Sequence, residues 1–258
     1  MSAQGGPVAF ERHVIEAEHL GERVPVAVHQ FSPPNTLTEE APVLIASGGV
    51  DTWKEDLHPV WVAYATWTQM TVLAFDIAGT GESTVPMTPD GGADIVSSLV
   101  REARELGNGR VAHVGISMGG HFAARTGLIG EVDAAVVVGG PVKAAFAWRP
   151  QTNTNMTGVV GNAFGFQEQP TDEELAARWA AFSLADLLKG HESAPMFVVN
   201  GADDPLIPQQ DTLLFEGRPG AEVHLIPDSG HCATNKIAEV MPQIFAWLGN
   251  VLAPQHTP

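Results

Sequence analysis

Apolar and polar positions alternate near the start of the chain and then give way to short runs that are wholly apolar. The alternation over residues 8–18 and 23–31, on either side of Gly21, predicts an antiparallel β-hairpin. Later runs without polar alternation are typical of strands in a parallel sheet covered on both faces. These runs are residues 43–46, 71–75, 111–116, 134–138, 196–200 and 223–226.

Helical spacing of apolar residues separates most of these runs. Residues 93–106 place Ile95, Leu99 and Ala103 on one stripe, which predicts an amphipathic crossover helix, and residues 237–252 predict a closing helix. Strands that alternate with helices indicate right-handed βαβ units. We therefore predict an α/β fold with a mostly parallel, doubly wound sheet and an N-terminal antiparallel hairpin.

Residues 141–190 interrupt this alternation. Within them, Thr171 and Glu174 have the spacing of a capping box, which predicts a helix over the following LAARWAAFSLADLL. A segment of about fifty residues is too long for a plain connection, and such long loops usually cover a binding site. We expect a cap or lid at residues 141–190, inserted in a single domain that spans residues 1–258.

The motif Gly115-Ile116-Ser117-Met118-Gly119 lies between a predicted strand and a predicted helix. This is the context of a nucleophile elbow, in which small neighbours let a serine sit on a sharp turn. The turn exposes the Ser117 hydroxyl and places the Met118 amide at the start of a helix, where it can donate to an oxyanion. The alternative is a glycine-rich turn in which Ser117 only caps the helix.

A serine nucleophile needs a base and a group that orients the base. His231 lies in a short loop between the last predicted strand and the last predicted helix, where a base is expected for this order of elements. His121 is expected to pack or to line the pocket floor, and His113 to be structural. Cys232 is expected to be a small buried filler.

Two adjacent carboxylates follow the strand at residues 196–200. Asp204 has the expected register after Gly201, and Asp203 is the less favoured candidate, expected to face solvent or cap the turn. Ser117, Asp204 and His231 then follow one another in the chain order of an α/β-hydrolase triad.

A second oxyanion donor is expected in the loop after the strand at residues 43–46. We predict the amide of Val50 or, less favoured, of Gly49, because adjacent glycines allow close approach of the main chain to a ligand. Thr52 and Glu55 have the spacing of a capping box for the next helix. Lys54 either reaches the pocket or, as is commoner for lysine, is exposed.

Aromatic residues in this loop and in the insertion are candidates for binding substrate. Trp53, Phe146 and Trp148, with Phe164 and Phe166, can line a pocket for a medium-sized apolar or aromatic acyl group. The alternative is that they pack the cap onto the body.

Composition and charge exclude several classes of protein. Thirty Asp and Glu against 13 Lys and Arg give a net charge of −17, which disfavours nucleic acid and anionic membranes as partners. No apolar stretch approaches the length of a membrane helix, and the N-terminus lacks the pattern of a secretion signal. The single cysteine, Cys232, fits a reducing cytoplasm. No spacing of ligands predicts a metal, and no motif predicts a cofactor.

These residues resemble the α/β-hydrolase superfamily over nearly the whole chain. The segments GGVDTWKED, FDIAGTGES and GISMGG resemble the branch with the fermentation-respiration switch protein, the pseudooxynicotine-type hydrolases and the fungal pigment hydrolases that shorten polyketides. The resemblance implies hydrolysis, without a cofactor, of esters or of carbon–carbon bonds beside ketones. Members of this branch commonly have a larger helical N-terminal region, so we do not carry over their substrate or their oligomeric state to this chain. The sequence leaves open whether the protein forms a homodimer.

The expected function is therefore serine hydrolysis of a small-molecule substrate through an acyl-enzyme. Two alternatives remain from the sequence. One is a thioesterase or acyltransferase in a biosynthetic pathway, which would differ in the acyl acceptor. The other is a ligand-binding protein on a hydrolase scaffold that has no turnover.

Overall fold

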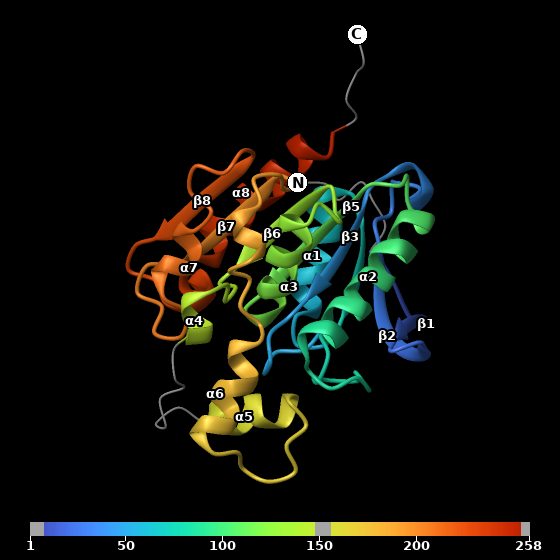
Figure 1. Ribbon diagram of the computed structural model, residues 1–258. Helices are drawn as coiled ribbons and strands as arrows, with labels where there is room; N and C mark the ends of the chain where they lie inside the picture. The colour runs from blue at the N-terminus through green and yellow to red at the C-terminus, as the bar shows by residue number, and fades with distance from the viewer. Residues whose placement is uncertain (1–7, 148–155, 254–258) are drawn as a thin grey trace.

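An eight-stranded sheet runs through the computed structural model, which describes residues 8–147 and 156–253 (Figure 1). The strand order is β1-β2-β4-β3-β5-β6-β7-β8, with antiparallel pairing of β1 with β2 and of β2 with β4 and parallel pairing elsewhere. The strands are β1 (Ala9–His19), β2 (Glu22–Ser32), β3 (Val43–Ser47), β4 (Thr71–Phe75), β5 (Val111–Ile116), β6 (Ala134–Val138), β7 (Met196–Gly201) and β8 (Ala221–Ile226). The predicted α/β class, the N-terminal hairpin and the parallel strands are confirmed.

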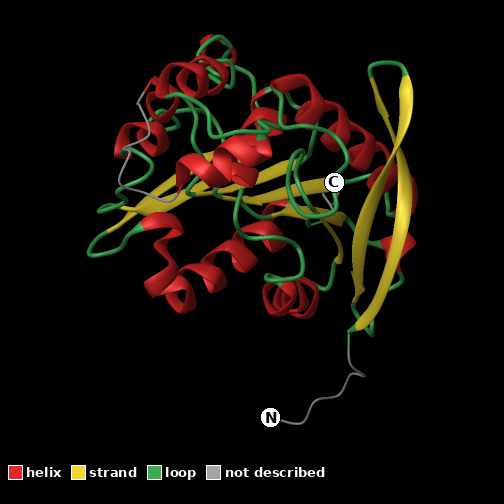
Figure 2. Cartoon of the chain, turned by 90° about the horizontal axis from the view of Figure 1, so that it is seen from below, coloured by secondary structure: helices red, strands yellow, loops and turns green. Residues whose placement is uncertain are grey.

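Helices cover both faces of the sheet, as Figure 2 shows. Helices α2 (Pro89–Leu106) and α3 (Met118–Leu128) pack on one face, and α1 (His58–Thr68) and α8 (Ile237–Val251) on the other. Strand β3 is buried throughout, and its residues alternate between the two cores: Val43 and Ile45 face α2 and α3, and Leu44 faces α1 and α8. Burial on both faces is why the sequence of β3 shows no polar alternation.

The segment between β6 and β7 contains the short helices α4 (Ala144–Ala147), α5 (Met156–Ala163) and α6 (Asp172–Ala180) and the 3₁₀ helix η2 (Leu187–Lys189). Of these, α5 and α6 lie together beyond one end of the sheet (Figure 1). The capping box of Thr171 and Glu174 is present at the start of α6. That this segment acts as a cap remains a prediction.

Helix α6 is shorter than the sequence pattern predicts. It ends at Ala180 because Phe182 turns inward to an exposure of 1%, where its ring lies 5.7 Å from that of Phe164. The main chain is then held outside a helix, since the Leu184 amide donates to the Val142 carbonyl at 2.9 Å. Contacts distant in sequence therefore override the helical pattern of this stretch.

The predicted capping box at Thr52 and Glu55 is wrong. Helix α1 begins at His58, and the Thr52 hydroxyl donates to Asp51 Oδ1. The Glu55 carboxylate instead contacts the ammonium of Lys54, which is neither exposed nor in the pocket but buried with 0% exposure. Compensating carboxylates make this burial of a lysine tolerable.

A buried carboxylate holds the beginning of the inserted segment. Asp211, in the short helix α7 (Gln209–Leu213), is 0% exposed. It accepts hydrogen bonds from the consecutive main-chain amides of Val142, Lys143, Ala144 and Ala145 at 2.6–3.1 Å. Four amides converge on one carboxylate, so the main chain that leaves β6 is fixed where it enters the insertion.

None of the helices within residues 8–147 and 156–253 combines the length and the apolar character that crossing a bilayer requires.

The substitution Asp211→Ala would leave these four amides without their acceptor. Because those of Val142 and Ala145 lie in buried surroundings, we expect the free energy of unfolding to fall by about 3–5 kcal/mol. Urea unfolding monitored by circular dichroism measures this change. The control Asp203→Ala removes an exposed carboxylate and should change stability by no more than about 0.5 kcal/mol. Equal effects of the two substitutions would contradict the anchoring role.

Candidate active site

Ser117 occupies a sharp turn between β5 and α3. Its φ of 56° and ψ of −123° lie outside the regions that L-residues usually adopt. The turn needs glycine on both sides: a Cβ on Gly115 would lie 2.1 Å from the Gly119 carbonyl oxygen, and a Cβ on Gly119 would lie 2.4 Å from the Gly48 oxygen. This is the local geometry of a nucleophile elbow, which presents a hydroxyl above the end of the sheet.

The structure brings Ser117, His231 and Asp204 into one hydrogen-bonded series. His231 Nε2 lies 2.9 Å from Ser117 Oγ, and His231 Nδ1 lies 2.7 Å from Asp204 Oδ2. The three residues follow β5, β8 and β7, whose carboxyl ends meet at the same edge of the sheet. An ionised carboxylate only accepts hydrogen bonds, so Nδ1 donates to Asp204, and Nε2 of the neutral ring accepts from Ser117.

Asn200 is a component of this site that the sequence analysis missed. Its Nδ2 donates to Asp204 Oδ2 at 2.8 Å, and its Oδ1 accepts from the Cys232 amide at 2.9 Å. One buried side chain therefore links the loop of the acid to the loop of the histidine. The signal was a polar residue at the end of the apolar run MFVV. Asp204 Oδ1 also accepts from the Leu206 amide at 2.7 Å, and Asp203 is exposed.

The paired charges of His231 and Asp204 shift both pKa values. Burial lowers the pKa of His231, but the hydrogen bond to Asp204 and the neighbouring negative charge outweigh this, so its pKa is raised. Burial raises the pKa of Asp204, but its hydrogen bonds with His231, Asn200 and the Leu206 amide outweigh this, so its pKa is lowered. The pair thus stabilises an imidazolium beside a carboxylate, which is the state a base reaches after it takes a proton.

Two main-chain amides lie where an oxyanion could form. The amides of Met118 and Val50 donate no hydrogen bond to any group within the described ranges, and both residues line the pocket at Ser117. Gly49 is also close to the serine, because a Cβ built on it would lie 3.0 Å from Ser117 Cβ. Amides with free donor capacity beside a hydroxyl can stabilise negative charge. Their catalytic role remains a prediction.

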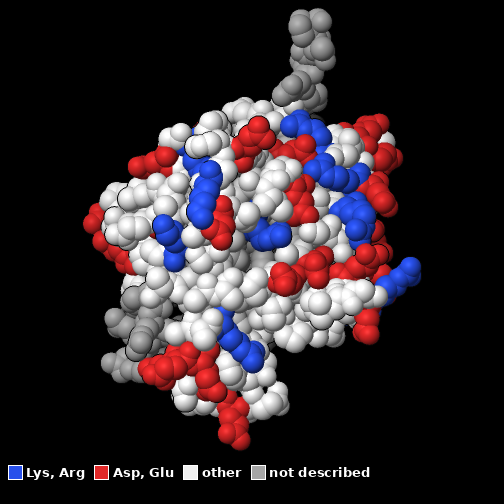
Figure 3. All heavy atoms as spheres, in the orientation of Figure 1, with Lys and Arg blue, Asp and Glu red and all other residues white. Residues whose placement is uncertain are grey.

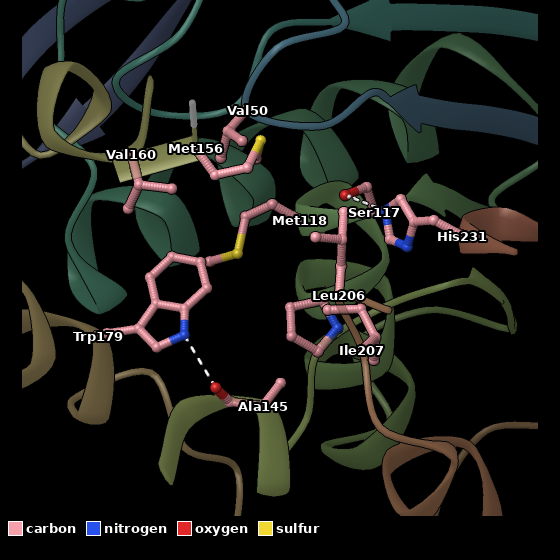
Figure 4. Close-up of a pocket in the computed structure, with 11 residues that line it drawn as sticks. Val50, Ser117, Met118, Ala145, Met156, Val160, Trp179, Leu206, Ile207 and His231 are labelled. Carbon is pink, nitrogen blue, oxygen red and sulfur yellow. Dashed lines mark hydrogen bonds between the residues drawn. The ribbon is translucent and has the colours of Figure 1, made fainter. Parts of the chain in front are cut away.

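A cavity of about 70 Å³ opens beside Ser117 and His231 (Figure 4). Apart from Ser117 and His231, its lining is apolar or aromatic, with Trp179 and Ala145 joined by a hydrogen bond from Trp179 Nε1 to the Ala145 oxygen. The other lining residues are Val50, Met118, Pro141, Met156, Val160, Leu206 and Ile207. The inserted segment and the loop after β7 both contribute residues to the lining of the cavity.

The aromatic residues expected to bind substrate are placed elsewhere, except Trp148, which lies outside the described residues. Trp53 is 46% exposed and does not line the cavity, because its loop runs outward between Val50 and Lys54. Phe146 is buried against Trp179 and His121, with ring centroids 5.2 and 5.1 Å apart. It packs the insertion onto α3. Trp179, which the sequence analysis did not select, lines the cavity instead.

His121, His113 and Cys232 are buried outside the hydrogen-bonded series. His121 packs against Phe122 and Phe182, and burial lowers its pKa to about 3. His113 Nδ1 lies 3.0 Å from the Thr126 hydroxyl, and burial lowers its pKa to about 3. Cys232 is 3% exposed. Both histidines are therefore neutral structural groups near pH 7, as expected.

One group among the described residues has ligand atoms close enough to hold a metal ion: His29, Glu55 and Glu82, all within 4.8 Å of one another. Lys54 Nζ lies 2.8 Å from an oxygen of each of these two glutamates. An ammonium group thus already occupies the position of a cation between the carboxylates.

Comparison with known proteins identifies the family. The sequence profile described as "Alpha/beta hydrolase family" matches residues 43–240, which is most of the chain. The chain therefore belongs to the alpha/beta hydrolase family.

Two fungal proteins are similar over part of their length. Hydrolyase poxO of Penicillium oxalicum is 30% identical over 139 residues, which cover 48% of this chain and 32% of that protein. Hydrolase ORFZ of Pyricularia oryzae is 29% identical over 142 residues, which cover 50% of this chain and 33% of that protein. The matches thus span about a third of these relatives, and the predicted resemblance to fungal hydrolases is confirmed.

Solved structures share the fold. The 2,6-dihydroxy-pseudo-oxynicotine hydrolase has a TM-score of 0.76 at 20% identity, over 95% of this chain and 68% of that one. The esterase Pf2001 of Pyrococcus furiosus has a TM-score of 0.63 at 19% identity, over 94% and 90%. At these identities the likeness establishes the architecture, and the chemistry rests on the site itself.

We predict that the His231 imidazole titrates above its ordinary value of 6.5 and that Asp204→Asn lowers this pKa. Without the carboxylate, its hydrogen bond and charge no longer favour the imidazolium, whereas burial still disfavours it. Because the folded-state pKa is raised, the stability that His231 contributes is complete below pH 6.5 and is lost as pH rises through its folded pKa. NMR titration of the ring measures both variants.

The control is Asp203→Asn, which alters an exposed neighbour that makes no hydrogen bond to His231 and should leave the titration unchanged. An unshifted His231 in Asp204→Asn would show that the carboxylate does not set the charge of the ring.

Proposed function

We propose that this protein is a serine hydrolase that cleaves an ester, or a carbon–carbon bond beside a ketone, through an acyl-enzyme. The observation that supports this most strongly is the series from Ser117 Oγ through His231 to Asp204, at 2.9 and 2.7 Å, at the mouth of an apolar cavity. A hydroxyl is a weak nucleophile alone, and this arrangement supplies the base and the group that orients it.

In the proposed reaction, His231 Nε2 accepts the Ser117 proton as Oγ bonds to the substrate carbonyl carbon. The carbonyl oxygen becomes an oxyanion near the amides of Met118 and Val50. His231 then passes the proton to the leaving group, which is an alcohol in the ester reaction or a carbon atom in the ketone reaction. Water, deprotonated by His231, attacks the acyl-enzyme and releases a carboxylic acid and free Ser117.

The cavity favours a small apolar acyl group. Its volume of about 70 Å³ corresponds to roughly five water-sized spheres, and its walls are aliphatic, thioether and indole groups. A charged acyl group would lose hydration there without gaining a partner. The alcohol or ketone side of a medium-sized substrate would extend toward the opening beside His231.

The names of the similar proteins are consistent with hydrolysis. They include esterases and a hydrolase of a pseudo-oxynicotine compound. Thioester hydrolysis or acyl transfer would use the same acyl-enzyme with a different leaving group or acceptor. We favour hydrolysis because the family and its named relatives are hydrolases.

The substitution Ser117→Ala should abolish labelling by a fluorophosphonate probe and lower kcat on p-nitrophenyl esters by about 10⁶-fold, because it removes the hydroxyl on which the acyl-enzyme would form. Mass spectrometry of the labelled protein locates the adduct. The control Ser183→Ala alters an exposed serine and should leave both properties unchanged. Folded wild-type protein that takes up no probe would refute the serine mechanism.

The substitution Val160→Ala should shift preference toward longer acyl chains, because Val160 lines the cavity and is only 6% exposed. We expect the ratio of kcat/KM for p-nitrophenyl hexanoate to that for the acetate to rise by about tenfold. Val159→Ala changes the adjacent residue of α5, which does not line the cavity, and should leave this ratio unchanged. An unaltered ratio in Val160→Ala would place the acyl group elsewhere.

A further inference from the structure

Lys54 is a fully buried charge that the proposed reaction does not use. Its side chain is 0% exposed, and Nζ lies 2.6 Å from Asp76 Oδ2 and 2.8 Å from both Glu55 Oε1 and Glu82 Oε2. Burial lowers the pKa of Lys54, but its hydrogen bonds with the three carboxylates outweigh this, so its pKa is raised and the side chain stays protonated. A lysine enclosed in this way is costly to displace, because three carboxylates would lose their counter-charge.

The main chain of Lys54 is tied to the same carboxylate as its side chain. Its amide donates to Asp76 Oδ1 at 2.9 Å, while Nζ donates to Asp76 Oδ2. Asp76 immediately follows β4, which pairs with β3, and its Oδ2 also accepts from the Glu82 amide at 3.0 Å. The end of the loop that follows β3 is thereby fixed to the body of the sheet.

A second contact fixes the beginning of this loop. The Gly48 carbonyl accepts a hydrogen bond from the Gly119 amide at 3.0 Å, two residues after Ser117. Between the two attachments, the amides of residues 49–52 donate no hydrogen bond to any group in the described part of the chain. The position of the Val50 amide is therefore set by the two ends of the loop together with the packing of the buried Val50 side chain.

We propose that Lys54 is a positioning residue that holds the Val50 amide in place for the oxyanion by clamping its loop to Asp76, Glu55 and Glu82. The inference rests on the proposed serine mechanism, since it concerns the amide that would meet the oxyanion. The side chains of β1 and β2 extend the clamp. Arg12 pairs with Glu82 at 2.5 Å, and His29 Nε2 lies 3.6 Å from Glu55, so the N-terminal hairpin reaches the same network.

The test is Lys54→Met, which keeps the length of the side chain and removes its charge. Active sites are counted by end-point titration with a fluorophosphonate, so that misfolded protein is left out of the rate. We expect kcat per titrated site to fall by about 10²-fold, since a donor misplaced by about 1 Å loses most of its effect on the transition state. KM should stay within about twofold, and affinity for a trifluoromethyl ketone should fall with kcat/KM.

The pH dependence of kcat/KM should keep its midpoint in this variant, because Lys54 makes no contact with His231. The matched control is Lys189→Met, which removes an exposed lysine paired with one carboxylate, Asp186, and should leave kcat unchanged. Glu82→Gln removes the ion pairs of Glu82 with Lys54 and with Arg12 but leaves Lys54 paired with Asp76 and Glu55, so we expect a smaller loss of kcat in the same direction. It provides the test if Lys54→Met does not fold.

Hydrogen exchange provides a readout that does not depend on activity. The Lys54 amide, which donates to Asp76 Oδ1, and the Gly119 amide, which donates to the Gly48 carbonyl, should exchange at least about tenfold faster in either variant than in the wild type, because the loop has lost an attachment. A folded variant with wild-type kcat per titrated site and wild-type exchange would overturn the role of Lys54. Wild-type protein that fluorophosphonate does not label would instead overturn the serine mechanism, while the exchange data still judge the clamp.

Discussion

The strained turn at Ser117 is the constraint on which the site depends. A serine at φ 56° and ψ −123° persists only where the surrounding structure holds it. Strand β5 holds the chain before the turn, because it is hydrogen-bonded to β3 and β6 and its first five residues are buried. Helix α3 holds the chain after the turn, since the Gly119 amide donates to the Gly48 carbonyl. The hydroxyl is thus presented at the end of a buried strand that is paired on both sides, and only loops need to be brought to it.

Buried carboxylates bring those loops into place. Asp204 accepts from His231, Asn200 and the Leu206 amide, Asp76 accepts from Lys54 and the Glu82 amide, and Asp211 accepts from four consecutive amides of the insertion. Charge-assisted hydrogen bonds are stronger than neutral ones, so each carboxylate can hold a loop or the start of a short helix. One aspartate therefore holds each of three segments: Asp204 holds the loop after β7, Asp76 holds the loop after β3, and Asp211 holds the start of the insertion.

The charge of the surface contrasts with the apolar cavity. On the face in Figure 3, Asp and Glu outnumber Lys and Arg and are dispersed over the body and the inserted helices, in keeping with a net charge of −17. The negative charge of the surface disfavours the approach of anions, in addition to the desolvation cost that a charged group would meet in the apolar cavity. Salt weakens this repulsion over distances of about 10 Å. Exclusion of nucleic acid, a cytoplasmic location and a homodimer stay predictions, as does the cap role of residues 141–190.

The local pattern of apolar and polar residues was sufficient to predict the strands, and local motifs predicted Ser117, Asp204 and His231 of the site. Apolar runs predicted the strands, because burial on both faces leaves no polar alternation, and the glycines around Ser117 predicted the turn, because a Cβ there would collide with main chain. Chain order after successive strands then selected His231 and Asp204. Tertiary contacts alone decided that Lys54 is buried, that α6 ends early at Ala180, and that Trp179 rather than Trp53 or Phe146 lines the cavity. These outcomes depend on which charges and rings meet across residues far apart in the chain, and hydrophobic periodicity contains no information about such partners.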